Sequence, residues 1–212
     1  AHAARIRSLL ETVGISIRDP EDLTWEELDG LECAPGNELG PFLRVELGLE
    51  IERLALVKSQ IGKLEKVRRR ELEEGKSEPM KKARRLQSLR GIGPNITMTL
   101  ISELAWREYR NGKELGASVG LTPTPYQSGE QELERGISKA GNRRVRRLMI
   151  EASWLWLRWQ PQSDLSRWYE SRFSGTRRGK RIGITALSRK LLIALWRFWE
   201  HGVVPNRAIV NV

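Results

Sequence analysis

The sequence contains very little cysteine and histidine. Cys33 is the only cysteine in 212 residues, which excludes a disulfide within the chain and a zinc site made of several cysteines. His2 and His201 stand at opposite ends of the sequence without a pattern of partner residues, so we expect neither to act as a metal ligand or a general base. The low cysteine content fits a reducing compartment.

The sequence also lacks a signal peptide and any run of about 18 apolar residues, so it predicts no membrane-spanning segment. It begins at Ala1 without a methionine, inside an expected helix. We therefore expect the chain to be a fragment or a processed product. Its length still allows one or two domains with a hydrophobic core.

Acidic residues are scarce in the second part of the chain. Residues 1–80 contain 12 Lys and Arg against 17 Asp and Glu, a net charge of −5, whereas residues 81–212 contain 25 against 10, a net charge of +15. This uneven distribution favours a polyanionic partner for the second part. A phosphodiester backbone is the expected ligand.

The spacing of apolar residues predicts a mainly α fold. Residues 3–13 carry one apolar stripe and predict a short helix, and residues 16–41 form an acidic connector interrupted by Pro and Gly. From residue 42 to about 74, apolar residues recur at spacings close to the roughly 3.5-residue period of a coiled coil. We expect a long helix that pairs within or between chains, with packing against its own domain as the alternative. A helical run from Pro79 would return antiparallel, which makes residues 42–85 an antiparallel coiled coil.

The segment Leu89–Pro94 joins two helical patterns through a Gly-Ile-Gly-Pro turn. It resembles a helix-hairpin-helix, in which glycines let backbone N–H groups approach a phosphate without reading sequence. A tight turn between two helices, without a ligand, is the alternative.

A candidate hydroxyl nucleophile lies in the Gly-punctuated segment Gly120–Arg147. Pro123 and Pro125 have no backbone N–H and restrict the residues before them, so the chain is expected to be extended there. Ser128 follows shortly after, beside Gly129, which permits close approach of a ligand.

A strongly basic helix is expected to begin after Asn142, a preferred N-cap residue. The N-terminus of a helix offers free N–H groups and a favourable dipole to an anion. The arginines of the first turns lie largely off the apolar stripe, and a merely solvated face is the alternative. The expected nucleic-acid contacts of the whole chain are Arg90, Gly91, Gly93, Arg135, Ser138, Lys139, Asn142, Arg143, Arg144, Arg146, Arg147, Arg177, Arg178, Lys180 and Arg181.

The remainder of the sequence predicts more helix. Residues 164–173 and 185–201 have helical apolar spacing, and the basic residues 174–181 between them are expected to form a loop. The tryptophan cluster of residues 154–199 follows the helical stripes, so we expect it in the core and not on a base-stacking surface.

The chemistry of Ser128 would need outside help. A serine hydroxyl is a weak nucleophile until a base or metal assists its deprotonation, and a phosphoryl transition state needs positive charge near its oxygens. Arg135, Lys139, Arg143 and Arg144 can supply this charge. The only acids nearby are three glutamates between residues 130 and 134, which we expect to be solvated charges and not metal ligands.

Several ordered motifs over about residues 86–155 resemble the Piv-like, bridge-RNA-guided insertion-sequence transposase and recombinase family. The matching segments are LRGIGP (89–94), VGLTP (119–123), YQSGE (126–130), GISKAGNRRVRRL (136–148) and EASW (151–154). Their order makes the match more specific than any one of them alone.

The resemblance implies a domain order. Residues 1–41 correspond to a linker helix and acidic connector, residues 42–85 to a coiled coil, and residues 86–212 to a C-terminal transposase domain with a helix-hairpin-helix-like turn. The RuvC-like domain that precedes these parts in the family, with four metal-binding acidic residues, is expected to be absent from this chain. No cofactor is expected in this fragment, and Mg²⁺ is expected only through the RuvC-like domain of the intact protein.

The resemblance also implies an activity. The matching position makes Ser128 the catalytic serine, which attacks a DNA phosphate and forms a transient phosphoserine link. A guide (bridge) RNA would select the DNA targets, and coiled coils would join protomers into a homo-oligomer, a dimer or a tetramer on DNA. The protein would act in the bacterial cytoplasm, associated with the nucleoid when bound to DNA, and this fragment alone is expected to bind and not to cut.

Two other functional classes remain open at this point. A non-enzymatic nucleic-acid-binding scaffold would use the Gly91–Pro94 turn and the Arg143–Arg147 face but not the Ser128 hydroxyl. A purely structural coiled-coil protein would use neither. Salt-dependent binding of nucleic acid by residues 81–212 contradicts the structural alternative.

Overall fold

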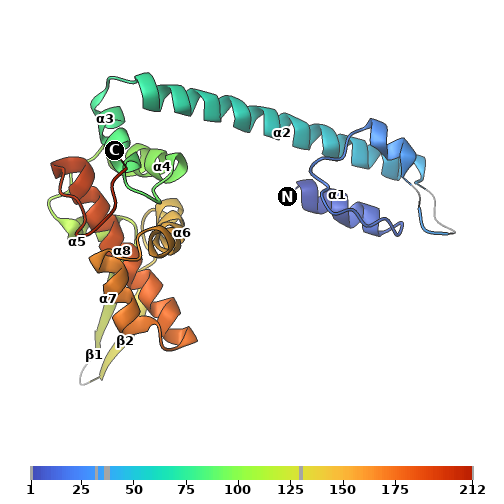
Figure 1. Cartoon of the computed structure of the whole chain (residues 1–212). Helices are drawn as coiled ribbons and strands as arrows, with labels where there is room; N and C mark the ends of the chain where they lie inside the picture. The colour runs from blue at the N-terminus through green and yellow to red at the C-terminus, as the bar shows by residue number, and fades with distance from the viewer. Residues whose placement is uncertain (1, 32, 36–38, 129–130, 212) are drawn as a thin grey trace. The chain divides into compact units, whose positions relative to one another are not determined.

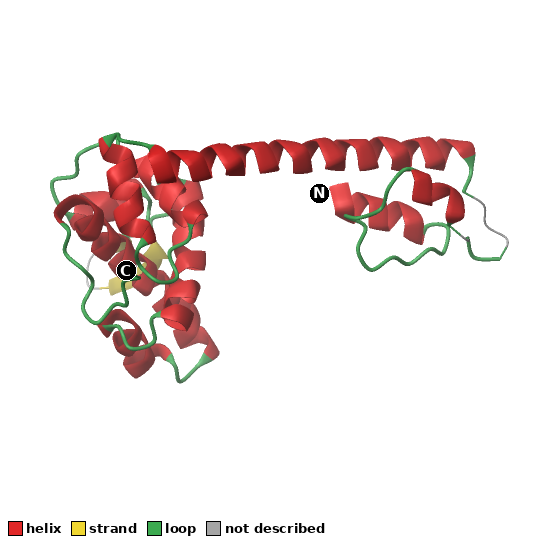
Figure 2. Ribbon diagram, turned by 45° about the horizontal axis from the view of Figure 1, so that its top comes forward, coloured by secondary structure: helices red, strands yellow, loops and turns green. Residues whose placement is uncertain are grey.

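The computed structural model describes residues 2–31, 33–35, 39–128 and 131–211, and the side chains of residues 29 and 124–135 also lie outside the description. The described chain is mainly helical, which confirms the predicted class (Figures 1 and 2). It divides into two compact units, residues 1–67 and 68–212. The domain boundaries expected at residues 41 and 85 stay a prediction. Among the described helices, none is long and apolar enough to cross a membrane.

The first unit contains α1 (His2–Glu11), a 3₁₀ helix η1 (Glu26–Gly30) and most of α2 (Pro41–Glu74). Ile6, Leu10 and Leu47 are fully buried in its core. Glu50 is also buried, and its carboxylate accepts hydrogen bonds of 2.6 Å from His2 and from Arg53. These donors hold the pKa of Glu50 below its ordinary value, with the His2 hydrogen bond as the largest cause.

The helix α2 confirms the predicted long helix. Apolar side chains remain exposed along it, among them Leu56 (58% exposed), Ile61 (49%) and Leu64 (64%). Its coiled-coil pairing, within the chain or with a second copy, stays a prediction.

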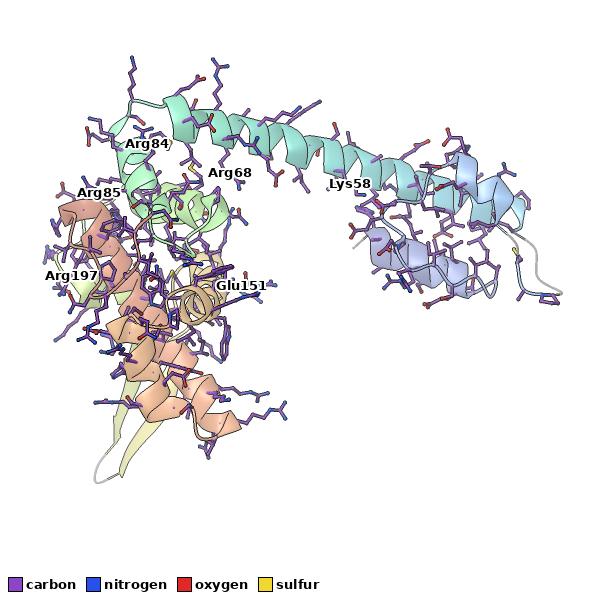
Figure 3. The ribbon with its side chains drawn as sticks, in the orientation of Figure 1. Lys58, Arg68, Arg84, Arg85, Glu151 and Arg197 are labelled. Atoms are coloured by element: carbon purple, nitrogen blue, oxygen red, sulfur yellow. The ribbon has the colours of Figure 1, made fainter. Side chains whose placement is uncertain are left out.

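The second unit packs six further helices and one hairpin. They are α3 (Glu78–Gln87), α4 (Pro94–Leu104), α5 (Gly112–Ser118), β1 (Pro123–Ser128), β2 (Gln131–Ile137), α6 (Arg143–Trp159), α7 (Asp164–Phe173) and α8 (Arg177–His201). The inner faces of α4, α6 and α8 share one core, in which Leu100, Met149 and Leu191 are fully buried. On α3, Arg84 donates to the carbonyls of Leu72 and Gly75 and so satisfies the end of α2 that belongs to this unit (Figure 3).

The predicted basic loop over residues 174–181 is wrong in its second half, because α8 already begins at Arg177. The Thr176 side chain caps this helix by accepting a hydrogen bond from the Gly179 N–H at 2.9 Å. Gly183 lets Phe173 lie against the helix, since a Cβ at residue 183 would be 2.4 Å from the Phe173 ring. The contact between Phe173 and Gly183 therefore allows α8 to include the basic, glycine-containing residues at its start.

The prediction for the tryptophans is only partly correct. Trp156 and Trp199 are buried, but Trp154 is 47% exposed and Trp159 is 39% exposed. Helical spacing identified the helices that carry these tryptophans, but not whether each side chain faces the core or the solvent.

The segment from Pro205 to Asn211 returns to the turn before α4. The Arg90 N–H donates to the Ile209 carbonyl at 3.1 Å. The fully buried side chain of Gln160 joins the turn to this segment. Its Nε2 donates to the carbonyls of Arg90 and Ile209, and its Oε1 accepts from the Ile209 N–H at 2.7 Å. One amide thus fixes a turn to a segment more than a hundred residues away.

Candidate nucleic-acid interface

The loop that leads into α6 is tied to the end of α5 by backbone hydrogen bonds. The Asn142 N–H donates to the Ser118 carbonyl at 2.9 Å, and the Ser138 N–H donates to the Thr122 carbonyl at 2.9 Å. These bonds close the base of the β1–β2 hairpin and set the direction in which it leaves the helices.

Two glycines allow the loops to approach this closely. Gly120 has a φ of +69°, and a Cβ there would lie 2.0 Å from the Ala140 carbonyl oxygen; Gly141 has a φ of +82°, and a Cβ there would lie 2.1 Å from the Ser118 carbonyl oxygen. No side chain fits at either position. Lys139 also has a positive φ, +56°. This left-handed backbone conformation is energetically unfavourable for any residue other than glycine. We call this arrangement the glycine latch.

Asn142 caps α6 as predicted, with its Oδ1 accepting from the Val145 N–H at 3.0 Å. Its Nδ2 donates to Glu103 of α4 at 2.9 Å, and Arg144 donates to the other oxygen of Glu103 at 2.9 Å. The carboxylate therefore holds the start of α6 against α4. The predicted contacts of Asn142 and Arg144 with nucleic acid stay predictions.

The other arginines of the first turns differ in their surroundings. Arg146 donates to loop carbonyls, including that of Val119 at 2.9 Å, so it supports the glycine latch. Arg147 lies 3.3 Å from Glu151 on the same helix. Arg143 is exposed and makes no ion pair within the described chain. Of the four, Arg143 and Arg147 are the most available to a ligand.

Ser128 ends β1, and its backbone pairs with Gln131 in the antiparallel register. Five residue steps at about 3.3 Å separate it from Pro123, roughly 17 Å along the strand. Figure 1 shows the two strands leaving the helices of their unit. The side chains of Ser128 and Arg135 lie outside the described residues, so their predicted roles are untested.

The turn before α4 contains three predicted contact residues, of which Arg90 and Gly91 lie beside the end of α6. Gly91 has a φ of +88°, and a Cβ there would lie 2.9 Å from the Trp159 Cβ. Gly93 is different, because a Cβ there would meet nothing within 4 Å. The Arg90 guanidinium lies 5.4 Å from the centre of the Trp159 ring.

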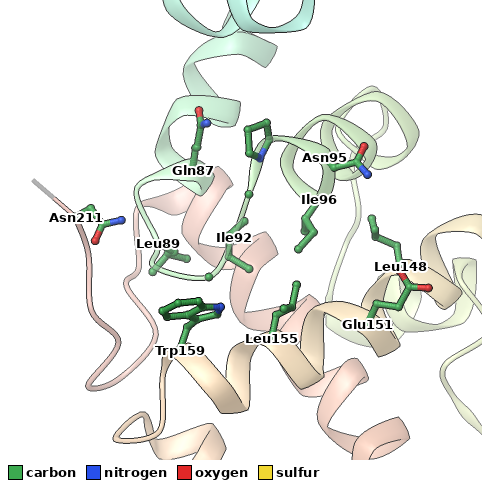
Figure 4. Close-up of a pocket in the computed structure, with 13 residues that line it drawn as sticks. Gln87, Leu89, Ile92, Asn95, Ile96, Leu148, Glu151, Leu155, Trp159 and Asn211 are labelled. Carbon is green, nitrogen blue, oxygen red and sulfur yellow. The ribbon is translucent and has the colours of Figure 1, made fainter. Parts of the chain in front are cut away.

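An open groove of about 450 Å³ lies between this turn and α6 (Figure 4). Ile92 and Leu155 form part of its apolar floor, and the Trp159 ring closes one end. A second hollow continues from it, lined by Arg143 and Arg147, and the two share the side chains of Asn95, Leu148 and Glu151.

The remaining predicted cations lie on the first turns of α8. Arg177, Arg178, Lys180 and Arg181 are exposed, and no ion pair involves them within the described chain. Positive charge at the N-terminus of a helix opposes the helix dipole, so a bound anion would relieve an unfavourable arrangement.

The described residues contain no group of three or more His, Cys, Asp or Glu side chains that could hold a metal. One carboxyl near the glycine latch has a shifted pKa. The Arg110 N–H and the Arg107 guanidinium donate to Glu114 on α5 and lower its pKa below the ordinary value, the backbone donor being the larger cause.

A family model described as "Transposase IS116/IS110/IS902 family" matches residues 83–167. These residues include the turn before α4, the hairpin and all of α6. The glycine latch and the groove residues other than Asn211 therefore belong to the matched region, whereas α8 lies beyond it.

Three relatives extend the similarity. A putative transposase, y4rJ, from Sinorhizobium fredii is 36% identical over 99% of this chain and 56% of its own length. The transposase for insertion sequence element IS1328 from Yersinia enterocolitica is 30% identical over 59% of this chain and 38% of its own length. The transposase for IS1111A from Coxiella burnetii is 26% identical over 90% of this chain and 51% of its own length. The chain thus spans about half the length of the curated relatives that it matches.

Proposed function

We propose that the chain belongs to an insertion-sequence transposase family, that it binds DNA and that it supplies Ser128 as the nucleophile for strand cleavage and exchange; the match of the transposase family model to residues 83–167 and the similarity to curated transposases support this. The observation that carries this proposal is the match of ordered motifs across the hairpin and α6. The proposal concerns the activity of a full-length transposase, and this chain spans about half the length of the relatives that it matches.

In the proposed reaction, the Ser128 oxygen attacks the phosphorus of a DNA phosphodiester. A serine–phosphate bond forms, the bond from phosphorus to one sugar oxygen breaks, and the serine proton passes to a base while the leaving oxygen gains a proton. Attack by a hydroxyl of another strand reverses these steps and joins the strands. Ser128 returns with its hydroxyl intact.

The hairpin explains why the base would come from outside this unit. A serine at the far end of a strand is held roughly 17 Å from the base of the hairpin, so it can reach into another domain or a second copy. The family resemblance makes a RuvC-like domain, which would bring Mg²⁺, the proposed source of deprotonation. Arg143 and Arg147 would bind phosphates beside the hairpin base and orient the strand.

Two further partners follow from the family resemblance. We propose that a guide RNA selects the DNA targets and that α2 joins protomers through its exposed apolar residues. The exposed side chains of Leu56, Ile61 and Leu64 support the second point.

The deciding experiment uses the full-length protein with guide RNA, Mg²⁺ and a nicked DNA target that prevents rejoining. Mass spectrometry then searches for a covalent protein–DNA adduct in the wild-type protein, in Ser128→Ala and in Ser171→Ala. Ser171 is an exposed serine on α7 and serves as the matched control. We expect an adduct on Ser128 in the wild-type and Ser171→Ala proteins and none in Ser128→Ala.

An adduct that persists in Ser128→Ala contradicts the assignment of the nucleophile. Equal DNA binding by all three proteins with no adduct in any of them leaves a non-enzymatic nucleic-acid scaffold.

A further inference from the structure

One row of side chains on α6 changes character along the groove. Positions four residues apart lie on one ridge of a helix, and here they are Arg143, Arg147, Glu151, Leu155 and Trp159. All five line the groove or its continuation. The ridge begins with cations and ends with an aliphatic and an aromatic side chain. Arg147 and Trp159 are separated by roughly 18 Å of helical rise.

The aromatic end of the groove presents a partly exposed ring beside apolar side chains. Trp159 remains 39% exposed although Gly91 packs against its Cβ, and Ile92 and Leu155 lie beside it on the floor (Figure 4). Large exposed rings next to apolar side chains are the surfaces on which unpaired bases stack. The volume of about 450 Å³ lies within the range of about 300–1,000 Å³ that is usual for small-ligand sites.

Polar groups surround this apolar floor. Gln87, Asn95 and Asn211 bring side-chain amides to its edge (Figure 4). An amide both donates and accepts hydrogen bonds, as the edge of a nucleobase does.

Cations lie beside the Trp159 ring, outside the groove lining, and in the second hollow, and the carboxylate of Glu151 lies where the groove and the hollow meet. The guanidinium groups of Arg90 and Arg158 each lie 5.4 Å from the centre of the Trp159 ring, and neither pairs with a carboxylate in the described chain. Arg143 and Arg147 line the second hollow. An apolar slot between two groups of cations matches a nucleotide strand, whose bases lie between negatively charged phosphates.

We propose that this groove binds an unpaired stretch of nucleic acid, with one base stacked on Trp159 and the flanking phosphates on the cations at either end. The inference rests on the proposed function in one respect, that the protein binds nucleic acid. A paired base cannot use the slot, because it stays within the stack of the duplex unless energy is spent to extrude it. The groove therefore selects single strands or locally opened duplex.

The test uses full-length protein carrying Ser128→Ala, so that no covalent chemistry contributes to binding. Affinity is measured for single-stranded DNA, single-stranded RNA of the same sequence and the corresponding duplex DNA, with Trp159→Leu, Trp159→Phe and Trp106→Leu added in turn. Trp106 is a more exposed tryptophan that does not line the groove and serves as the control. The DNA and RNA arms identify which strand the groove prefers.

We expect Trp159→Leu to weaken binding of the preferred single strand by roughly 5- to 100-fold, the loss typical of one base–aromatic stack. Trp159→Phe should retain most of the affinity, and Trp106→Leu should retain all of it. Binding of the duplex should change little in any variant. An abasic site is then moved along the preferred strand. At one position it should lower the affinity of the protein that retains Trp159 but not that of Trp159→Leu, because the two changes remove the same contact.

Equal losses for single strand and duplex in Trp159→Leu, or an abasic scan without a position coupled to Trp159, would overturn the proposal. A change of oligomeric state in Trp159→Leu without a loss of binding would instead make the groove a protein-docking site. Should Trp159→Leu unfold, the abasic scan is repeated with Trp159→Phe, and the loss of affinity at the coupled position should be smaller in Trp159→Phe than in the protein with Trp159 intact; equal losses would overturn the proposal. The absence of a Ser128 adduct in the wild-type protein refutes the proposed nucleophile but leaves this binding result standing.

Discussion

At the scale of single residues, the glycine latch controls the geometry of the candidate interface. Gly120 and Gly141 bring a backbone against a carbonyl oxygen at distances that no Cβ tolerates. The hairpin and the start of α6 share this latch, so a disturbance there reaches both. Its glycines therefore matter for positioning, although neither has a side chain to offer a ligand.

We expect Gly141→Ala to lower the free energy of unfolding by about 1–3 kcal/mol from its left-handed backbone, with a further loss from the clash with Ser118. Gly175→Ala is the control, because a Cβ at residue 175 meets nothing within 4 Å. Urea unfolding of both variants measures the difference. Equal stabilities would show that the loops separate without cost.

The pKa of Glu114 predicts a pH dependence. The pKa of Glu114 is lowered in the folded protein, so its carboxylate stabilises the folded state. This stabilisation is fully present above the pKa of a glutamate in the unfolded chain, about 4.3, and is lost as the pH falls through the lower pKa of the folded state. Glu114→Gln should be less stable than the wild type near neutral pH, and the two should converge in acid. Thermal unfolding as a function of pH provides the measurement, and parallel curves would contradict the prediction.

Residue-level prediction from the sequence succeeded where the interaction is local. Asn142 was identified as an N-cap because it bonds three residues ahead. Gln160 gave no signal, because its partners are backbone groups 49 and 70 residues away. The face of each tryptophan depends likewise on packing between helices, which is why the exposed Trp159 was assigned to the core.

At the scale of elements, α8 shows how tertiary packing overrides local preference. Its first turns are basic, contain Gly179 and Gly183, and oppose the helix dipole, so the sequence favoured a loop. The Thr176 cap and the contact of Phe173 with Gly183 stabilise the helix instead. The extended segment around Pro125 was predicted correctly, since proline restricts the chain in any context.

The charges at the start of α8 should affect stability and binding in opposite directions. We expect Arg178→Glu to raise the free energy of unfolding by about 0.5–1 kcal/mol, because an acid there favours the helix dipole. The same change should weaken nucleic-acid binding and reduce the slope of log K against log salt by about 0.9 for each phosphate that the variant no longer neutralises. Arg167→Glu, an equal charge change on α7, controls for net charge. Unchanged affinity in Arg178→Glu would remove this end of α8 from the interface.

At the scale of the whole molecule, the two units have separate hydrophobic cores. The cluster around Leu47 shares no buried residue with the cluster around Leu191. The charge of the sequence changes from acidic to basic near residue 80. The compact units meet between residues 67 and 68, inside the continuous helix α2, where no break in the sequence marks a boundary.

Separate cores predict separate unfolding. Leu47→Ala and Leu191→Ala each remove a fully buried side chain and should each cost about 2–5 kcal/mol. Hydrogen exchange of the described residues should show faster opening only in residues 1–67 for the first variant and only in residues 68–212 for the second. Faster exchange throughout the chain in either variant would show that the units unfold as one.

The bond between Arg90 and Ile209 has a consequence for synthesis. The ribosome adds Ile209 after a further 119 residues (209 minus 90), which takes about 6–24 s at about 5–20 residues per second. Until Ile209 is added, the turn at Arg90 lacks the segment that fixes it, and Gln160, once synthesised, lacks two of the three hydrogen bonds of its side chain. A nascent chain therefore acquires its groove late, after its basic residues are already exposed to nucleic acid, and early encounters with nucleic acid would rest on charge alone.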